Sequence, residues 1–111
     1  MHGTHLIVEA FSDDRKILNN DKKIKAILSK AAKIANYNVI TIASHKFERN
    51  GVTAFALLSE SHISIHTWPE LGYAAIDIFT CGDKNPKAAF NEIKSALKLK
   101  KIRMKKIKRG F

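Results

Sequence analysis

Cysteine, proline and glycine are scarce in this sequence, with one, two and five of them among its 111 residues. One cysteine cannot close a disulfide within the chain, so we expect the protein in a reducing cytoplasm. No stretch rich in proline, glycine or serine marks a linker, and no repeat or low-complexity segment interrupts the chain. A chain of this length fits one modest core, and we expect a single domain over residues 1–111.

Long apolar runs are absent as well. No stretch of the sequence is long enough to cross a bilayer as a helix. The first residues, MHGTHLIVEAF, lack the basic segment and the long apolar segment of a secretory signal. The sequence therefore predicts neither a membrane span nor a signal peptide.

Acidic residues are outnumbered, since ten stand against twenty lysines and arginines, and the formal net charge is +10. A charge of this size favours an anionic partner, nucleic acid included. Eight of the basic residues fall within residues 98–109, KLKKIRMKKIKR. No aromatic side chains for base stacking alternate with them, which favours a solvated terminal segment. A basic nucleic-acid-binding module stays as an alternative interpretation of the chain.

The spacing of apolar residues predicts two helices and a set of strands. One helix is expected over residues 21–35, with Asn20 or Asp21 as its N-cap. A second helix is expected from Pro86, with Asn85 as its N-cap. Strands are expected over residues 4–11, 38–47, 52–58, 61–68 and 73–81, and the final segment, 100–108, has an ambiguous pattern.

The resulting order, β-α-β-β-β-β-α-β, predicts an α+β fold. We expect a two-layer sandwich in which an antiparallel sheet carries two helices on one face. The other face of the sheet would stay open and partly apolar. In a small protein a second copy of the chain commonly covers such a face, so we expect a dimer.

Residues 59–83, SESHISIHTWPELGYAAIDIFTCGD, concentrate reactive side chains in what reads as a hairpin. Its turn, PELG, has proline and glycine where hairpins need them. With the turn centred near Glu70, residues that face each other have numbers summing to about 140. Cys81 then returns to the neighbourhood of Glu60 and Ser61.

Along the first strand of this hairpin, His62, Ser64, His66 and Trp68 alternate onto one face. No aspartate stands near a serine–histidine pair, so a hydrolase triad is not indicated. The spacing of histidine and cysteine matches no zinc motif, and no metal site is expected. The residues by themselves leave two interpretations open, ordinary packing of the hairpin or a reactive site around its cysteine.

The same segment resembles the signature of the short prokaryotic S-adenosylmethionine decarboxylase proenzymes. Similar segments of that family are matched by HLIVE at 5–9, GVT at 51–53, KAAFNEIKSALK at 87–98 and RG at 109–110. The resemblance spans nearly the whole chain. It implies a pyruvoyl-dependent carboxy-lyase that makes the aminopropyl donor for spermidine synthesis.

Members of this family are made as precursors that cleave themselves, which here implies a cut between Glu60 and Ser61. By resemblance, the Ser61 hydroxyl attacks the Glu60 carbonyl to give an ester, and β-elimination then breaks the ester. Residues 1–60 become the β chain and residues 61–111 the α chain. Ser61 becomes a covalent pyruvoyl group, which forms a Schiff base with the substrate amine and accepts the electron pair that decarboxylation releases.

The resemblance also implies roles for three further side chains. Cys81 matches the residue that returns a proton to the substrate during catalysis. His66 matches a residue that assists proton transfer during self-cleavage and belongs to the catalytic set. Thr53 stands where the family carries a hydroxyl that assists ester formation, with threonine here in place of serine.

Substrate binding is implied for Phe47, Trp68 and Glu70. Phe47 and Trp68 match the positions that flank the adenine, and aromatic rings suit both this base and the sulfonium cation of S-adenosylmethionine. Glu70 matches a carboxylate that accepts hydrogen bonds from the ribose hydroxyls. The family further implies a homodimer of processed αβ protomers and no metal activator. An arginine or ornithine decarboxylase of the same family stays as an alternative.

Overall fold

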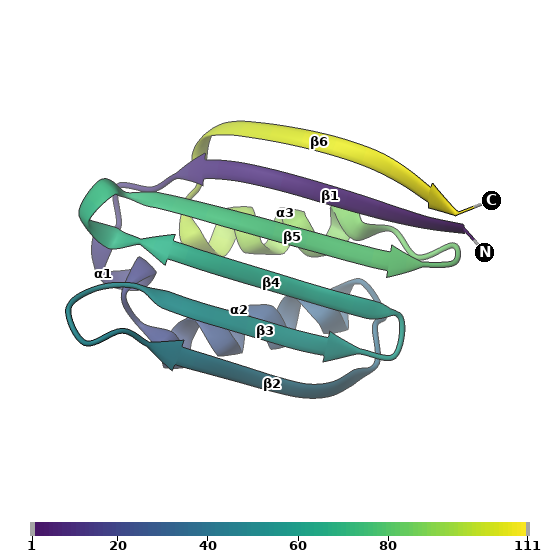
Figure 1. The fold of residues 1–111 in the computed structure, drawn as a ribbon, viewed down its shortest axis with the longest axis horizontal. Coiled ribbons are helices and arrows are strands. Elements are labelled where there is room, and N and C mark those ends of the chain that lie inside the picture. The colour runs from purple at the N-terminus through teal and green to yellow at the C-terminus, as the bar shows by residue number, and fades with distance from the viewer. Residues whose placement is uncertain (1, 111) are drawn as a thin grey trace.

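The computed structural model describes residues 2–110, and these residues form a six-stranded antiparallel sheet with helices packed against one face (Figure 1). The order of the strands across the sheet is β2-β3-β4-β5-β1-β6. Their bounds are β1 (His2–Phe11), β2 (Val39–Lys46), β3 (Val52–Leu58), β4 (Ser61–Trp68), β5 (Tyr73–Cys81) and β6 (Lys100–Gly110). The predicted α+β two-layer fold is confirmed.

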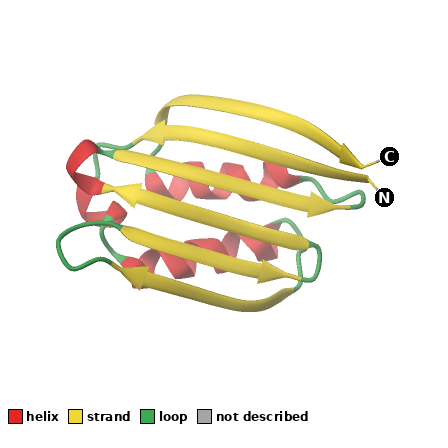
Figure 2. Cartoon of the chain, in the orientation of Figure 1, coloured by secondary structure: helices red, strands yellow, loops and turns green. Residues whose placement is uncertain are grey.

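Two long helices cover the sheet, α2 (Asp21–Ile34) and α3 (Pro86–Leu97), as Figure 2 shows in red. Each begins at an asparagine, because the Asn20 side chain accepts from the Lys23 N–H and the Asn85 side chain accepts from the Lys87 N–H. Both predicted caps are confirmed. Among the described residues, no helix is long and apolar enough to cross a membrane.

Three features differ from the expected elements. A short helix, α1 (Arg15–Leu18), and a 3₁₀ turn, η1 (Pro69–Leu71), are present that periodicity does not predict, because each is too short to show a period. The ambiguous final segment is an edge strand, β6, paired with β1. Its side chains are exposed on both faces apart from the half-buried Ile102, so no alternation of apolar and polar residues marks it.

The core lies between the sheet and the two long helices. Alternate residues of β4 and β5 are fully buried there, with helix side chains against them: Ile63, Ile65, Ile76, Ile78, Ile24, Leu28 and Ile93. Burying one such side chain contributes about 1.5–3 kcal/mol. The remaining side chains of β4 and β5 therefore point away from the helices, toward the uncovered face of the sheet.

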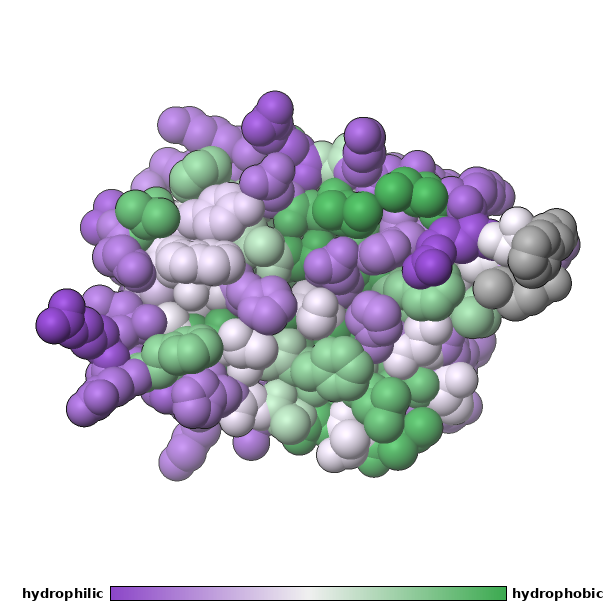
Figure 3. Space-filling view, viewed as in Figure 1, coloured by the Kyte–Doolittle hydropathy of each residue, from purple (hydrophilic) through white to green (hydrophobic). Residues whose placement is uncertain are grey.

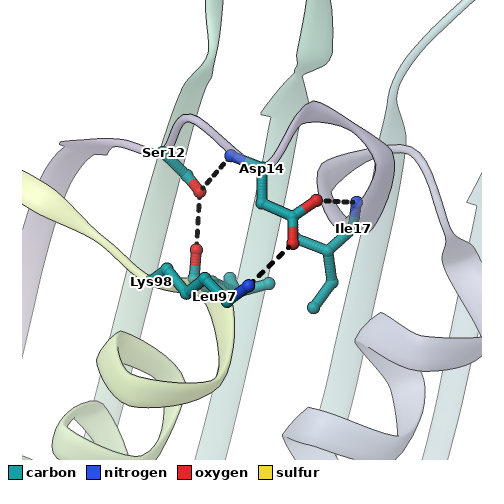
Figure 4. Close-up of polar contacts among 5 residues, drawn as sticks. All are labelled: Ser12, Asp14, Ile17, Leu97 and Lys98. Carbon is teal, nitrogen blue, oxygen red and sulfur yellow. Dashed lines mark hydrogen bonds and ion pairs between the residues drawn. The ribbon is translucent and has the colours of Figure 1, made fainter.

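The connection between β1 and α1 is anchored to the end of α3 (Figure 4). The Ser12 hydroxyl donates to the carbonyl oxygen of Leu97 at 2.7 Å and accepts from the Asp14 N–H at 3.1 Å. The Asp14 carboxylate accepts from the Ile17 N–H and pairs with Lys98 Nζ at 3.3 Å. These contacts lower the pKa of Asp14, the Ile17 hydrogen bond most. These contacts hold the start of α1 (Arg15–Leu18) against the end of α3.

The face of the sheet away from the helices carries exposed apolar side chains among polar ones (Figure 3). Six of these apolar side chains are 38–40% exposed: Ile7, Phe11, Phe55, Leu57, Trp68 and Ile107. They come from β1, β3, β4 and β6, so they spread across the sheet. This is the surface that a second copy of the chain would bury in the predicted dimer.

Candidate active site

The turn between β3 and β4 contains a strained backbone position at Ser61. Ser61 has a backbone φ of 151°, a value that residues other than glycine rarely adopt. Backbone held in such a region costs on the order of 1–3 kcal/mol and persists only where its surroundings enforce it. The strain lies at the residue that the family resemblance places at the cleavage point.

Glu60 forms the peptide bond that precedes Ser61, and hydrogen bonds fix both its backbone and its side chain. Its carbonyl oxygen accepts a hydrogen bond of 2.9 Å from the Cys81 N–H. Its carboxylate accepts from the Asn38 N–H and from the Ser59 hydroxyl, each at 3.0 Å. Burial acts to raise the pKa of Glu60, but these hydrogen bonds outweigh it and the pKa is lowered. The carboxylate is therefore charged and fixed at neutral pH.

Cys81 lies beside Ser61, as the hairpin predicts. Its Sγ is 3.6 Å from the Ser61 Oγ, within hydrogen-bonding distance for sulfur. The register differs by one residue from the symmetric hairpin, because Ser61 pairs with Thr80 and Trp68 pairs with Tyr73. The four residues from 69 to 72 join the strands through η1 and shift the pairing. Cys81, the last residue of β5, stays beside the first residue of β4 despite this shift.

A second polar pair lies toward the other end of β4. His66 Nδ1 is 3.0 Å from the Thr53 Oγ1, and the two residues face each other across β3 and β4. Both side chains are partly exposed on the uncovered face of the sheet. Next to His66 along β4, the Trp68 ring lies 6.5 Å away between centroids. The pair therefore opens toward solvent.

A cavity of about 380 Å³ adjoins this pair. Its lining includes the three side chains to which the family resemblance gives substrate binding, Phe47, Trp68 and Glu70, together with Thr53 and His66. Both aromatic rings are exposed, Phe47 by 47% and Trp68 by 40%, so their faces are available to a ligand. The structure brings these five residues together in one place.

The predicted site residues nevertheless form two clusters within one chain. Glu60, Ser61 and Cys81 meet at the start of β4, whereas His66 lies five residues further along the same strand. A strand rises about 3.3 Å per residue, which separates Ser61 from His66 by about 16 Å. His66 cannot reach the Ser61 hydroxyl of its own chain.

Between the two clusters lie residues to which sequence reasoning gave no role. His5 Nε2 is 2.9 Å from an Asp77 carboxylate oxygen, across β1 and β5. The His62 ring stacks on Phe55 with centroids 5.6 Å apart. Burial and the neighbouring His5 lower the pKa of His62. Alternation along β1 and β5 could have placed His5 and Asp77 on this face, but their pairing depends on two strands 72 residues apart.

Cysteine, histidine and acidic side chains do not gather as a metal site. Within residues 2–110, no three of them lie close enough together to hold a metal ion. Asn50 adds an amide to the lining of the cavity that holds His66 and Trp68, a residue that the sequence did not single out.

Comparisons with known proteins agree on one family. A family model described as S-adenosylmethionine decarboxylase matches residues 4–110. The S-adenosylmethionine decarboxylase proenzyme of Methanococcus aeolicus is 48% identical over 109 residues, which are 97% of this chain and 93% of that protein. The proenzyme of Thermotoga maritima is 43% identical, covering 97% of this chain and 84% of that one. The crystal structure of the adenosylmethionine decarboxylase from Aquifex aeolicus superposes with a TM-score of 0.90 at 37% identity, covering 98% of this chain and 91% of that chain.

Proposed function

The chain belongs to the S-adenosylmethionine decarboxylase family, and we propose that it does its chemistry with a pyruvoyl group made from its own Ser61. As a member of this family, the chain is a carboxy-lyase that is synthesised as a proenzyme. Its substrate is S-adenosylmethionine, in preference to the arginine or ornithine of the alternative, and its product is the aminopropyl donor of spermidine biosynthesis. The pyruvoyl group and the residues around it are the proposal.

Self-cleavage begins, in this proposal, with attack of the Ser61 Oγ on the Glu60 carbonyl carbon. The C–N bond breaks, the hydroxyl proton passes to the Ser61 amine, and an ester joins the two residues. Removal of the Ser61 Cα proton then breaks the Cβ–O bond and releases Glu60 as a carboxylate. Tautomerisation and hydrolysis of the remaining enamine release ammonia and leave the pyruvoyl end.

The observation that carries this proposal is the placement of Ser61. It is strained at φ 151°, and its hydroxyl lies against Cys81. The peptide that must break has its carbonyl oxygen hydrogen-bonded to a backbone N–H, which polarises the carbonyl toward attack. Breaking the bond also releases the strain at Ser61, so strain and polarisation favour the same step.

Cys81 is proposed as the proton donor of the decarboxylation. A pyruvoyl group formed from Ser61 would supply an electron sink for the carbanion that loss of CO₂ creates. The Cys81 thiol lies 3.6 Å from the hydroxyl of the residue that becomes this group. It is therefore near the atom that must receive a proton, as a general acid requires.

His66 and Thr53 are proposed to act on the Ser61 of a second copy of the chain. The two clusters lie about 16 Å apart along β4, too far for action within one chain. The uncovered face of the sheet carries the His66–Thr53 pair and Cys81, and its apolar side chains need cover. An isologous homodimer that packs these faces with opposite strand directions would bring each cluster to the other cluster of its partner.

Substrate recognition is assigned to the cavity beside His66. The exposed rings of Phe47 and Trp68 suit a flat adenine and a sulfonium cation. Glu70 supplies a carboxylate that can accept hydrogen bonds from two ribose hydroxyls. No second carboxylate lines this cavity among the described residues, so a guanidinium substrate would have a single anionic partner there.

Release of labelled CO₂ tests the substrate assignment. Purified protein is incubated in parallel with carboxyl-labelled S-adenosylmethionine, arginine and ornithine. We expect release from S-adenosylmethionine and none above background from the free amino acids. A preference for either free amino acid would contradict the proposed role of the aromatic cavity.

A further inference from the structure

The side chain of Asn19, at the C-terminal end of α1, ties this short helix to the turn between β2 and β3. Its Oδ1 accepts a hydrogen bond of 2.8 Å from the Gly51 N–H, and its Nδ2 donates to the Asn50 Oδ1 at 3.3 Å. Asn19 stands outside the lining of the proposed nucleoside cavity beside His66. Its contacts therefore act on that cavity from behind.

The turn that Asn19 holds is the one that places Phe47. The Phe47 N–H donates to the Gly51 carbonyl oxygen at 2.9 Å and closes residues 47–51 into a compact turn. Gly51 has a φ of 112°, and a Cβ here would lie 2.9 Å from the Thr67 carbonyl oxygen and 3.7 Å from the Phe47 ring. Gly51 thus joins Asn19 to Phe47, because its N–H bonds to one and its carbonyl to the other.

The helix behind this turn is itself firmly held. The Thr67 hydroxyl donates to the Leu18 carbonyl oxygen at 2.6 Å and accepts from the Val52 N–H at 2.9 Å. All three of these residues are buried. The start of α1 is anchored to the end of α3 (Figure 4). The helix is therefore a fixed support, and Asn19 is the side chain by which it reaches the turn.

The same segment also holds a second wall of the cavity. The Ser12 N–H donates to the Gly72 carbonyl oxygen at 2.8 Å, directly after η1, which carries Glu70. Gly72 has a φ of 63°, and a Cβ there would lie 2.8 Å from the Ser12 carbonyl oxygen, so the two segments are in close contact. The segment around α1 therefore fixes Phe47 and Glu70 relative to each other.

We propose that Asn19 is a positioning residue for the substrate and acts through Gly51 and Phe47. An aromatic ring stacks on a flat base only if it is held at the right distance from the groups that bind the rest of the ligand, here Glu70. The Asn19 hydrogen bond orders the turn before the substrate arrives, so binding does not have to order it. This inference rests on the proposed nucleoside cavity and adds a residue outside it.

Steady-state kinetics of Asn19→Ala test this role. The variant removes the acceptor of the Gly51 N–H, and we expect KM for S-adenosylmethionine to rise about three- to tenfold, no more than loss of the ring itself. A loss of binding alone leaves kcat unchanged. Self-cleavage should also proceed at the parent rate, because Thr53 and His66 keep their own pairing across β3 and β4.

Asn19→Asp is the rescue variant. A carboxylate oxygen replaces Oδ1 as the acceptor for the Gly51 N–H, and the Asn50 amide can rotate to donate to the second oxygen. We expect KM of this variant to stay close to that of the parent. Asn20→Ala is the matched control, because this neighbouring side chain caps α2 by accepting from the Lys23 N–H. It should lower the melting temperature and leave KM unchanged.

A double variant tests the route through Phe47. Phe47→Ala removes the ring and should raise KM. If Asn19 acts through this ring, Asn19→Ala should raise KM no further in the Phe47→Ala background. The competing explanation is that Asn19 only stabilises the fold. It predicts that Asn19→Ala behaves like Asn20→Ala, with a lower melting temperature and the KM of the parent.

Four results would overturn the inference. The first is the parent KM for Asn19→Ala, and the second is an Asn19→Ala chain that does not fold, which would make the residue structural. The third is a KM for Asn19→Asp as high as that of Asn19→Ala. The fourth is a further rise of KM when Asn19→Ala is added to Phe47→Ala. An unchanged KM for Phe47→Ala would instead refute the proposed cavity, so the two failures are distinguishable.

Discussion

The backbone N–H of Cys81 donates a hydrogen bond of 2.9 Å to the carbonyl oxygen of Glu60, the carbonyl that Ser61 is proposed to attack. The thiol of the same cysteine lies 3.6 Å from the Ser61 hydroxyl. Cys81 thus faces the cleavage point with two different groups. In the proposed function the backbone N–H serves self-cleavage and the thiol serves decarboxylation, and a substitution of the side chain separates the two roles.

Cys81→Ala should therefore cleave and yet decarboxylate poorly. Alanine keeps the N–H and removes the proton donor, and a positioned general acid contributes about 10²–10⁴-fold to rate. We expect CO₂ release per cleaved chain to fall by at least about 10²-fold. The fraction cleaved is read by mass spectrometry on the same sample, with Ser95→Ala on the exposed side of α3 as the control. Full turnover by Cys81→Ala would contradict the assignment.

Two inactive variants should complement each other if the site spans two chains. Ser61→Ala keeps His66 and cannot cleave, whereas His66→Ala keeps Ser61 and lacks its helper. When the two are co-expressed, we expect the His66→Ala chain to be cut and the Ser61→Ala chain to stay intact. Distinct affinity tags let mass spectrometry follow each chain.

The control for this experiment is each variant expressed alone. His66→Ala alone should stay largely uncut, because no copy in its dimer supplies the imidazole. Equal cleavage of His66→Ala with and without its partner would show that His66 does not act across the interface.

Trp68→Ala should weaken substrate binding more than it slows chemistry. The ring lines the cavity with Phe47 and Glu70, and loss of one aromatic contact to a flat or cationic ligand costs about 0.5–2 kcal/mol. We expect KM to rise roughly tenfold, since about 1.4 kcal/mol corresponds to tenfold in binding, while kcat changes less. Leu71→Ala, at a side chain 62% exposed in the same turn and outside the cavity, should leave both constants unchanged. An unchanged KM for Trp68→Ala would exclude this cavity as the nucleoside site.

Acid should weaken the uncleaved precursor partly through Glu60. Its folded pKa is lowered from 4.5, so its contribution to stability is present above that ordinary value and is lost as pH falls through the folded pKa. In a Ser61→Ala background, Glu60→Gln should lower the melting temperature at pH 7, and the difference should shrink at about pH 3. Glu92→Gln is the control, since the ion pair that Glu92 makes among residues 2–110 is with the exposed Lys30. A difference that stays constant with pH would contradict a charged, hydrogen-bonded Glu60.

Most of the fold follows from local patterns in the sequence. The strand bounds of β3, β4 and β5 and the caps of α2 and α3 match expectation, because alternation and capping residues act over a few positions. The exact pairing of Ser61 with Thr80 was not predicted. It depends on the 3₁₀ turn η1 between the two strands, which is too short to leave a periodic pattern in the sequence. The edge strand β6 lacked a pattern because both of its faces are exposed.

The candidate site was predictable to a lesser degree. Hairpin geometry alone brings Cys81 back to Ser61, which the structure bears out. The length of β4 already separates Ser61 from His66, although a resemblance assigns them to one reaction. The pairing of His5 with Asp77 could not be predicted, because it joins two strands whose residues are 72 positions apart. Such contacts between distant segments leave no periodic trace in the sequence.

Denaturing mass spectrometry of the purified protein tests the central claim most directly. The account predicts two chains in place of the 12.5 kDa precursor, one ending at Glu60 and one beginning with a blocked, ketone-bearing residue at position 61. Ser61→Ala should give the intact chain alone. An intact precursor in a preparation that decarboxylates S-adenosylmethionine would contradict the account.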